Sequence, residues 1–204
     1  MKNRFFASMA FLGLTALVFT SCSKAPQAEM DAANAAVEQA KTAGADVYVH
    51  DNFVVLQDSL NNAMVSIESQ KSKFIKNYAT AKEHLAGVTQ FAAEVQLQAE
   101  ARKEEVKVEI QNTIAEVKIL VELNRQLILE APKGKEGTSA LEAIKGEVDV
   151  VEASINETSN LFETGDYLAT LDKAKATKEK ATAINTELTD VIAKYKTNVK
   201  NRKS

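Results

Sequence analysis

Apolar side chains recur every three or four residues along most of the chain, a spacing that places them on one face of an α-helix. The clearest short example lies in residues 53–67. Its large apolar side chains are Phe53, Leu56, Leu60, Met64 and Ile67. Ahead of it, residues 29–43 are so rich in Ala that a helix is expected there, with Gly44 capping its end. The pattern therefore predicts two helices in the first part of the chain.

Two short segments interrupt the pattern and predict connections between helices. Residues 45–50 hold two valines around Tyr48 without a helical stripe, which favours an extended connector. Asp51 or Asn52 is expected to cap the helix that follows. Residues 69–77 are poor in apolar side chains and end in Asn, a residue common in turns, so we expect a turn there.

The apolar stripe then continues without a strong break over residues 77–130. No Pro occurs between Pro26 and Pro132, and the one interior Gly, Gly87, costs a helix only about 1 kcal/mol. The charged residues 102–105 are the main candidate for a kink. The sequence predicts one helix, roughly 80 Å long at 1.5 Å per residue. Its expected buried positions are Tyr78, Ala81, Leu85, Val88, Ala92, Val95, Ala99, Val106, Ile110, Ile114, Val117, Val121 and Ile128.

Two more helices are predicted after a charged loop that begins at Pro132. Ser139 and Glu142 have the spacing of a capping box, and Gly165 and Asp166 are expected to end one helix and begin the next. The expected buried positions are Leu141, Ile144, Val148, Val151, Ile155 and Phe162 in the first helix, and Tyr167, Leu171, Ala174, Ala181, Ile184, Leu188, Val191 and Tyr195 in the second.

Composition supports the same fold class. Strong helix formers dominate the 204 residues, with only seven Gly, two Pro, no Trp and 6% aromatic residues, which excludes a mostly β fold. The expected fold is all-α: an elongated antiparallel bundle of about five helices, in which two helical hairpins share one long central helix. We expect the N-terminal hairpin unit at residues 28–131 and the C-terminal hairpin at residues 132–204.

The start of the chain has the pattern of a secretory signal peptide, which we place at residues 1–21. Lys2 and Arg4 precede the uncharged, mostly apolar residues 5–19. About 15 apolar residues are fewer than the roughly 20 that a membrane-spanning helix needs. The chain's only Cys, Cys22, follows directly.

The order Phe19, Thr20, Ser21, Cys22 resembles a bacterial lipobox. That resemblance implies cleavage before Cys22, a diacylglycerol on its thiol and an acyl chain on its new amino group, with residues 22–27 as a lipidated tether. Two or three acyl chains would hold the protein stably on a bilayer. The alternative is an ordinary signal peptide followed by a buried or incidental cysteine, which would leave an unpaired thiol on an exported protein.

Residues close to Cys22 indicate which membrane the lipidated protein is expected to reach. Ser23 fits sorting to the outer membrane of a Gram-negative cell, and the first acids, Glu29 and Asp31, lie late for a surface-export signal. We expect a lipid anchor in the outer membrane on its periplasmic face, with surface exposure as the alternative. Loss of residues 1–21 changes the formal net charge from −3 to −5, which argues against nucleic acid as a partner.

The two predicted turns that carry Tyr78 and Tyr167 look alike at an offset of 89 residues, which either duplication or convergence explains. The offset excludes tetratricopeptide repeats, whose period is about 34 residues.

An Ala-Gly-Ala run at residues 43–45, then Tyr48, then an amphipathic helix ending in a turn before Tyr78 are similar to a domain of unknown function in bacterial envelope lipoproteins. Its Ala-rich hairpins carry a Gly-Asp-Tyr turn. The resemblance covers residues 28–100, with a weaker echo over residues 139–188. It implies an extracytoplasmic helical module and supplies no catalytic residue.

Residues that could carry catalysis or bind metal are few. No phosphate-binding loop, hydrolase motif or dinucleotide fingerprint occurs, and one Cys with two His excludes Cys-based zinc and His-rich metal sites. Glu83 and His84 would point about 100° apart on a helix, and His50 beside Asp51 suits a cap or the surface. The five acids of residues 104–122 could suggest carboxylate ligands, but they lack the Glu-x-x-His pattern of helical di-iron sites. They are Glu104, Glu105, Glu109, Glu116 and Glu122. We expect no enzymatic activity and no cofactor.

Without a predicted reaction centre, we expect the function to depend on exposed surfaces of the helices. Residues 117–129 are apolar on more than one side, so either neighbouring helices wrap this segment or it is left for a partner helix or a homo-oligomer. The apolar residues outside its main stripe are Ile119, Leu120, Leu123 and Leu129. Asn124 lies among them and either fixes the register of the bundle or faces solvent.

The leading hypothesis is a membrane-anchored helical scaffold or protein-interaction module with an envelope protein as partner. The alternative is a binding module for a small ligand, peptidoglycan or a surface polymer, using Tyr48, Tyr78, Tyr167 and the basic residues 194–203. Cations at that position also suit the negative end of a helix dipole.

Overall fold

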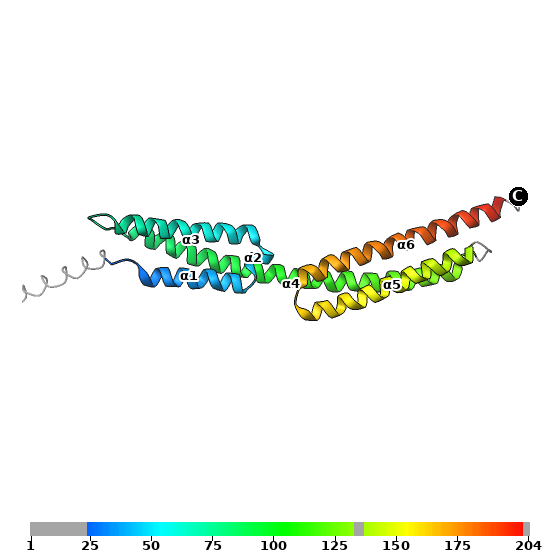
Figure 1. The fold of residues 1–204 in the computed structure, drawn as a ribbon. Coiled ribbons are helices and arrows are strands. Elements are labelled where there is room, and N and C mark those ends of the chain that lie inside the picture. The colour runs from blue at the N-terminus through cyan, green and yellow to red at the C-terminus, as the bar shows by residue number, and fades with distance from the viewer. Residues whose placement is uncertain (1–23, 133–136, 202–204) are drawn as a thin grey trace, which may run out of the picture. The chain divides into compact units, whose positions relative to one another are not determined.

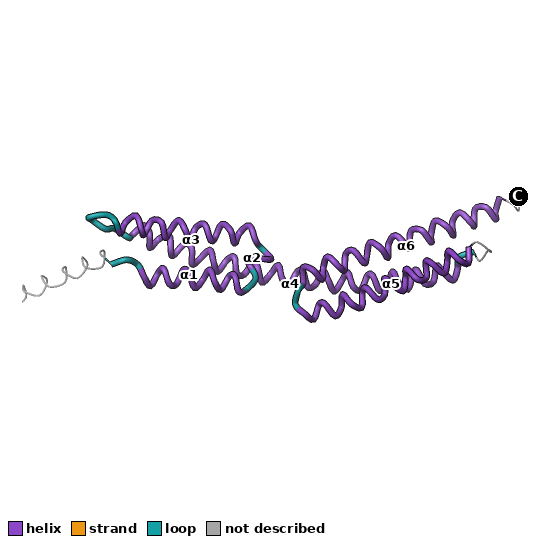
Figure 2. The backbone as a smooth tube through the Cα atoms, viewed as in Figure 1, coloured by secondary structure: helices purple, strands orange, loops and turns teal. Residues whose placement is uncertain are grey.

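The computed structural model describes residues 24–132 and 137–201, and every regular element in this part of the chain is an α-helix (Figure 1, Figure 2). The predicted signal peptide at residues 1–21 and Cys22 lie outside the described residues. The helices are α1 (Gln27–Thr42), α2 (Ala45–Tyr48), α3 (His50–Lys71), α4 (Ala79–Glu130), α5 (Gly137–Thr164) and α6 (Tyr167–Asn201). The predicted all-α helical bundle is confirmed.

The predicted long helix is α4, which runs for 52 residues without interruption. The charged residues 102–105, the main candidate for a kink, are helical. The chain divides into two compact units between Arg102 and Lys103, within α4. The first unit contains α1, α2, α3 and the beginning of α4, and the second contains the rest of α4 with α5 and α6.

The core of the first unit is formed by the stripes that the sequence pattern predicted. Ala recurs at buried positions of all the helices, which allows the helix axes to approach closely. The buried cluster comprises Ala33, Val37, Ala40, Ala45, Phe53, Leu56, Ala63, Ile67, Tyr78, Ala81, Leu85, Val88, Ala92, Val95 and Ala99. Leu60 and Met64 are half-buried and pack against it.

The core of the second unit lies between α4, α5 and α6. The buried cluster comprises Val117, Val121, Val148, Val151, Ile155, Ala181, Ile184 and Leu188, with Ile114, Leu141 and Ile144 partly buried against it. Val191 and Tyr195, expected on this face, are exposed, whereas Ile192 is buried. The expectation was wrong because a step of four from Leu188 keeps the stripe in phase at residue 192.

The connector at residues 45–50 is helical, not extended. Ala45 is buried and begins the single turn of α2, closed by hydrogen bonds from Tyr48 N to Gly44 O (2.9 Å) and from Val49 N to Ala45 O (3.1 Å). Each of the two valines lowers helix stability by only a few tenths of a kcal/mol relative to Ala. Burial of the Ala45 side chain is enough to offset a penalty of this size. α3 then begins at His50, with Val49 in the cap position, so neither Asp51 nor Asn52 caps it.

The turns contain one further correction and two confirmations. α5 already begins at Gly137, so Ser139 lies inside the helix and does not cap it. At the next turn Gly165 has φ +87°, and Asp166 Oδ1 accepts a hydrogen bond from Ala169 N at 3.2 Å, as a C-cap and an N-cap should. Gly44 ends α1 with φ +95°, as predicted.

Candidate functional site

The described chain begins two residues after the predicted lipid-attachment residue, Cys22, which is itself outside the described residues. α1 follows at Gln27, and its first turn is joined to the first turn of α4 by an ion pair between Glu29 Oε1 and Lys82 Nζ at 2.7 Å. The hydrogen bond from Lys82 holds the pKa of Glu29 below its usual value. The starts of α1 and α4 therefore lie together, at the end of the first unit that is nearest to Cys22 in sequence.

The three tyrosines proposed for ligand binding occupy separate places. Tyr78 is buried in the core of the first unit, and Tyr48 lies half-buried at the other end of α3. The 22 residues of α3 span about 33 Å between these two positions. Tyr167, in the second unit, packs on Phe162 with ring centroids 5.3 Å apart. Tyr48 and Tyr78 thus cannot contact one small ligand together.

Two lysines of the second unit lie over the ring of Tyr167. Lys107 Nζ is 5.0 Å and Lys103 Nζ is 5.8 Å from the ring centroid, within the range of cation–π attraction. These contacts join α4 to the start of α6. Tyr167 therefore packs at the turn between α5 and α6, which the sequence pattern had predicted.

The basic end of α6 is only partly described. Lys194 and Lys196 are exposed on the helix, which is described as far as Asn201, and residues 202–204 lie outside the description. The two histidines and the acid beside one of them are also at the surface: His84 and Glu83 are exposed, and His50 is exposed with its Nδ1 3.1 Å from Asp46 O. Over residues 24–132 and 137–201, no three His, Cys, Asp or Glu side chains gather as metal ligands.

One row of uncharged residues on the exposed side of α4 is the most extended feature of the second unit. Its members recur at steps of three or four residues, and none of them carries a charge over 19 residues. We call it the α4 row: Val108, Asn112, Ala115, Ile119, Leu123 and Gln126. The exposed fractions are 54% for Val108, 60% for Ile119 and 44% for Leu123.

The structure shows which side chains of residues 117–129 the neighbouring helices cover. Leu120 packs against the core, but Ile119, Leu123 and Leu129 are exposed, the last at 75%. The expectation that neighbouring helices wrap this segment is therefore wrong for three of its four side chains. With α5 and α6 on one side of α4, the three-helix core of this unit leaves the opposite side uncovered.

Asn124 is buried and bonded across the bundle. It is 1% exposed, its Nδ2 donates to Ala181 O at 2.9 Å, and its Oδ1 accepts from Asn185 Nδ2 at 2.8 Å. Sequence reasoning left its two roles open and missed Asn185, whose only signal is its place beside the stripe residue Ile184. The pair fixes α4 against α6, because a shift by one residue would leave buried amide groups unpaired.

Next to Asn124, Arg125 binds two acids of α5. Its Nη2 lies 2.6 Å from Glu152 Oε2 and 3.4 Å from Asp149 Oδ1. The charge of Glu152 is the main cause that raises the pKa of Arg125. Adjacent residues of α4 thus contact both other helices of the second unit.

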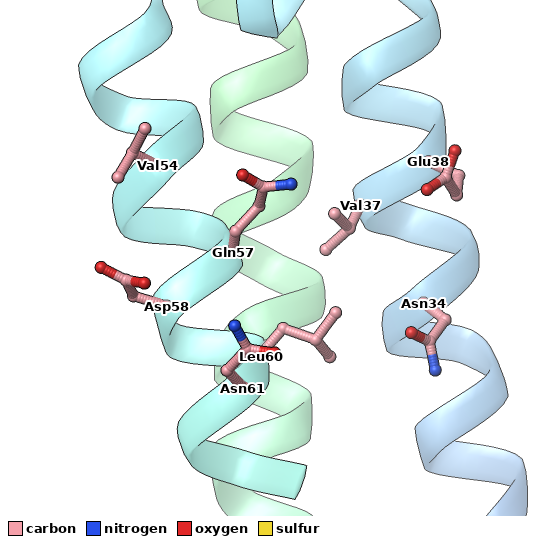
Figure 3. A pocket seen from close by; sticks show the side chains of 8 residues that line it. All are labelled: Asn34, Val37, Glu38, Val54, Gln57, Asp58, Leu60 and Asn61. Carbon is pink, nitrogen blue, oxygen red and sulfur yellow. The ribbon is translucent and has the colours of Figure 1, made fainter.

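Figure 3 shows a shallow hollow of about 290 Å³ between α1 and α3. Val37 and Leu60 point toward each other across it. Its lining is Asn34, Val37, Glu38, Val54, Gln57, Asp58, Leu60 and Asn61. All its amides and carboxylates are exposed, so they lack the desolvated surroundings that catalytic groups use.

A larger open hollow of about 700 Å³ lies between α5 and α6. Its lining is Ala143, Gly146, Glu147, Val150, Val151, Lys180, Ala183, Ile184 and Glu187. Its space comes from small side chains: a Cβ at Gly146 would meet nothing within 4 Å. It is an open surface groove, not an enclosed pocket of the kind that buries most of a small ligand.

Comparison with known proteins identified no relative of this chain. No family model matches the chain, and neither a curated protein nor a solved structure matches it. Among the helices that the structure describes, none is both long and apolar enough to cross a bilayer.

Proposed function

We propose that this chain is a cell-envelope lipoprotein, held in the outer membrane on its periplasmic face by acyl chains on Cys22. It acts as a non-enzymatic helical scaffold or protein-interaction module. The lipobox-like sequence before Cys22 supports the anchor. The exposed and scattered positions of the ionisable residues support a role for surfaces instead of a reaction centre.

The α4 row is the observation that carries the interaction role. At 1.5 Å per residue its 19 residues extend for about 28 Å, along which a second helix could pack at a shallow crossing angle. An uncharged row flanked by charged positions suits an amphipathic helix that lays its apolar face along it. The proposed partner is therefore an envelope protein that presents such a helix.

Photo-crosslinking in intact cells tests this role. A photoreactive residue at Ile119 should crosslink to a partner, whereas the same residue at Lys118, exposed on the same helix but about 100° around it, should not. Mass spectrometry of the adduct should place the partner's contact in a helix with an apolar face. Ile119→Asp with Leu123→Asp should abolish the adduct of a probe at Gln126 without changing the helical circular dichroism. Equal crosslinking from Ile119 and Lys118 would contradict the proposal.

The alternative, a module that binds a small ligand, peptidoglycan or a surface polymer, has weaker support. Tyr78 is buried, and Tyr48 and Tyr78 lie at opposite ends of α3. A single binding site would need these rings to converge.

A further inference from the structure

The turn between α3 and α4 exposes two large apolar side chains at its tip. Phe74 is 103% exposed and Ile75 is 81% exposed, the highest values among the large hydrophobic residues that the structure describes. They are adjacent, so they form one apolar tip. Burial of an aromatic and an aliphatic side chain is strongly favourable, and this turn leaves both in water.

Lysines surround this apolar tip. Residues 69–78 contain Lys71, Lys73 and Lys76 and no acid. Lys71 pairs with Glu68 at 2.6 Å, which raises its pKa, whereas Lys73 and Lys76 form no ion pair with any described residue. The tip thus combines an exposed apolar pair with two cations that have no anionic partner.

The turn lies at the end of the first unit from which the chain continues toward Cys22. α1 and α4 both begin at this end, as the ion pair between Glu29 and Lys82 shows, and α3 ends there. Figure 1 shows the start of α1 and the turn between α3 and α4 at the same end of this unit. Ala25 already packs against the core of the unit, and four residues from Cys22 to Pro26 reach at most about 14 Å.

The connection at the opposite end of the same unit has the reverse charge. Residues 42–52, which connect α1 to α3 through α2, contain Asp46 and Asp51 but no Lys or Arg. Their most exposed large apolar side chain is the single Val47, at 53%. Of these two connections, only the one nearest Cys22 therefore joins positive charge to a pair of exposed apolar side chains.

We propose that residues 71–76 are a second membrane contact beside the lipid anchor. Phe74 and Ile75 enter the interface of the bilayer, and Lys73 and Lys76 contact the headgroups of anionic phospholipids. This inference rests on the proposed anchor at Cys22, which brings the turn to the membrane. One acyl attachment leaves a protein free to rotate about it, and a second contact fixes α3 and α4 with their turn toward the lipid.

A single tryptophan reports the contact, because the chain has no Trp. The lipidated protein with Phe74→Trp, placed in vesicles of phosphatidylcholine and phosphatidylglycerol, should show blue-shifted emission that brominated lipids quench. Val47→Trp, at the opposite end of the unit, is the matched control and should keep the emission of a solvated indole. Equal emission and equal quenching for the two variants would overturn the inference.

Vesicle binding of the unlipidated chain measures the same contact. With Cys22→Ser, the protein should sediment with vesicles that contain phosphatidylglycerol, less so at high salt. Lys73→Gln with Lys76→Gln should weaken binding about 25-fold, because each lysine near an anionic surface contributes about fivefold. Lys194→Gln with Lys196→Gln removes two exposed lysines from α6 and is the control. An equal loss in both pairs would mean general charge attraction and overturn the inference.

The outcomes separate this contact from the anchor. A chain that carries acyl groups on Cys22 and stays on vesicles, while the indole of Phe74→Trp remains in water, would overturn only the second contact. Blue shift in native envelope membranes but not in pure lipid would mean that a protein covers the tip, which also overturns it. Phe74→Ser with Ile75→Ser should lower vesicle binding and leave the thermal transition unchanged, since both side chains are already exposed.

Discussion

At the scale of single residues, Asn124 and Glu29 show two ways in which polar groups position the helices. Asn124 is inside the second unit, where its amide bonds to Ala181 O and Asn185 join α4 to α6. Glu29 is at the surface of the first unit, where Lys82 joins α1 to α4. The buried pair is sensitive to substitution because its partners cannot turn to water.

Asn124→Ala should lower the free energy of unfolding by about 1 to 3 kcal/mol, since it leaves the Asn185 amide without its partner. Asn124→Leu with Asn185→Leu should recover most of this loss, because both polar partners are then absent. Chemical denaturation in urea measures both, and Gln126→Ala, exposed on the same helix, is the control. A loss no larger than that of the control would show that the pair does not contribute to stability.

Glu29→Gln should lower stability at neutral pH and have little effect in acid. The folded-state pKa of Glu29 is lowered from 4.5, so its contribution is present above pH 4.5 and is lost as the pH falls through the lowered value. Unfolding in urea at several pH values measures the gap in free energy of unfolding between the Glu29→Gln variant and the unsubstituted protein. In a Lys82→Gln background the gap should shrink, and a gap that persists there would contradict the account.

At the scale of elements, Gly44 and Gly165 end helices in the same left-handed conformation but in different surroundings. An added Cβ at Gly44 would come within 2.9 Å of Cδ2 of Tyr48, whereas at Gly165 it would meet nothing within 4 Å. The connection between α1 and α3 therefore requires a glycine both for its positive φ and for the close contact with Tyr48. The turn between α5 and α6 requires a glycine only for its positive φ.

Gly165→Ala should cost about 1 to 2 kcal/mol, the penalty of a side chain in the left-handed region. Gly44→Ala should cost more, because the ring of Tyr48 must also move, and such overpacking adds about 1 to 3 kcal/mol. Thermal and urea unfolding of the two variants compare them directly. Equal losses would show that the contact with Tyr48 is not tight.

The helices could be predicted because large apolar side chains repeat in phase over many turns. The buried positions from Tyr78 to Val121 could be predicted from their spacing alone, without knowing which helices pack against them. The turn at Gly165 and Asp166 could be predicted because both capping residues lie in the turn itself. The one-turn α2 could not be predicted, because it depends on burial of Ala45 in the core of the first unit, where α2 packs against α1 and α3. Short segments take their conformation from such contacts more than from propensity.

The candidate surfaces were less predictable than the helices. An apolar side chain such as Ile119 looks the same in sequence whether a neighbouring helix covers it or not, and only the packing of α5 and α6 shows which side of α4 is open. Phe74 and Ile75 were part of a segment interpreted only as a turn. Their proposed role as a membrane contact depends on the position of that turn beside the start of α1. This position is set by how α1, α3 and α4 pack.

At the scale of the whole molecule, the proposed membrane anchor precedes two helical units that present surfaces. The first unit brings the lysine-flanked turn to the end nearest Cys22, and the second unit exposes the α4 row. The same α4 contributes to both units, so its continuity over 52 residues links the unit that follows the proposed anchor to the proposed interaction surface.

The anchor at Cys22 is the claim on which this account depends most. Mass spectrometry of the N-terminal peptide, from protein extracted from the cell envelope, measures it directly. The account predicts a mature chain that begins at Cys22 and carries three acyl chains, two on the thiol-linked glycerol and one on the amino group. A membrane-extracted chain with a free thiol at Cys22, or one that retains residues 1–21, would contradict it.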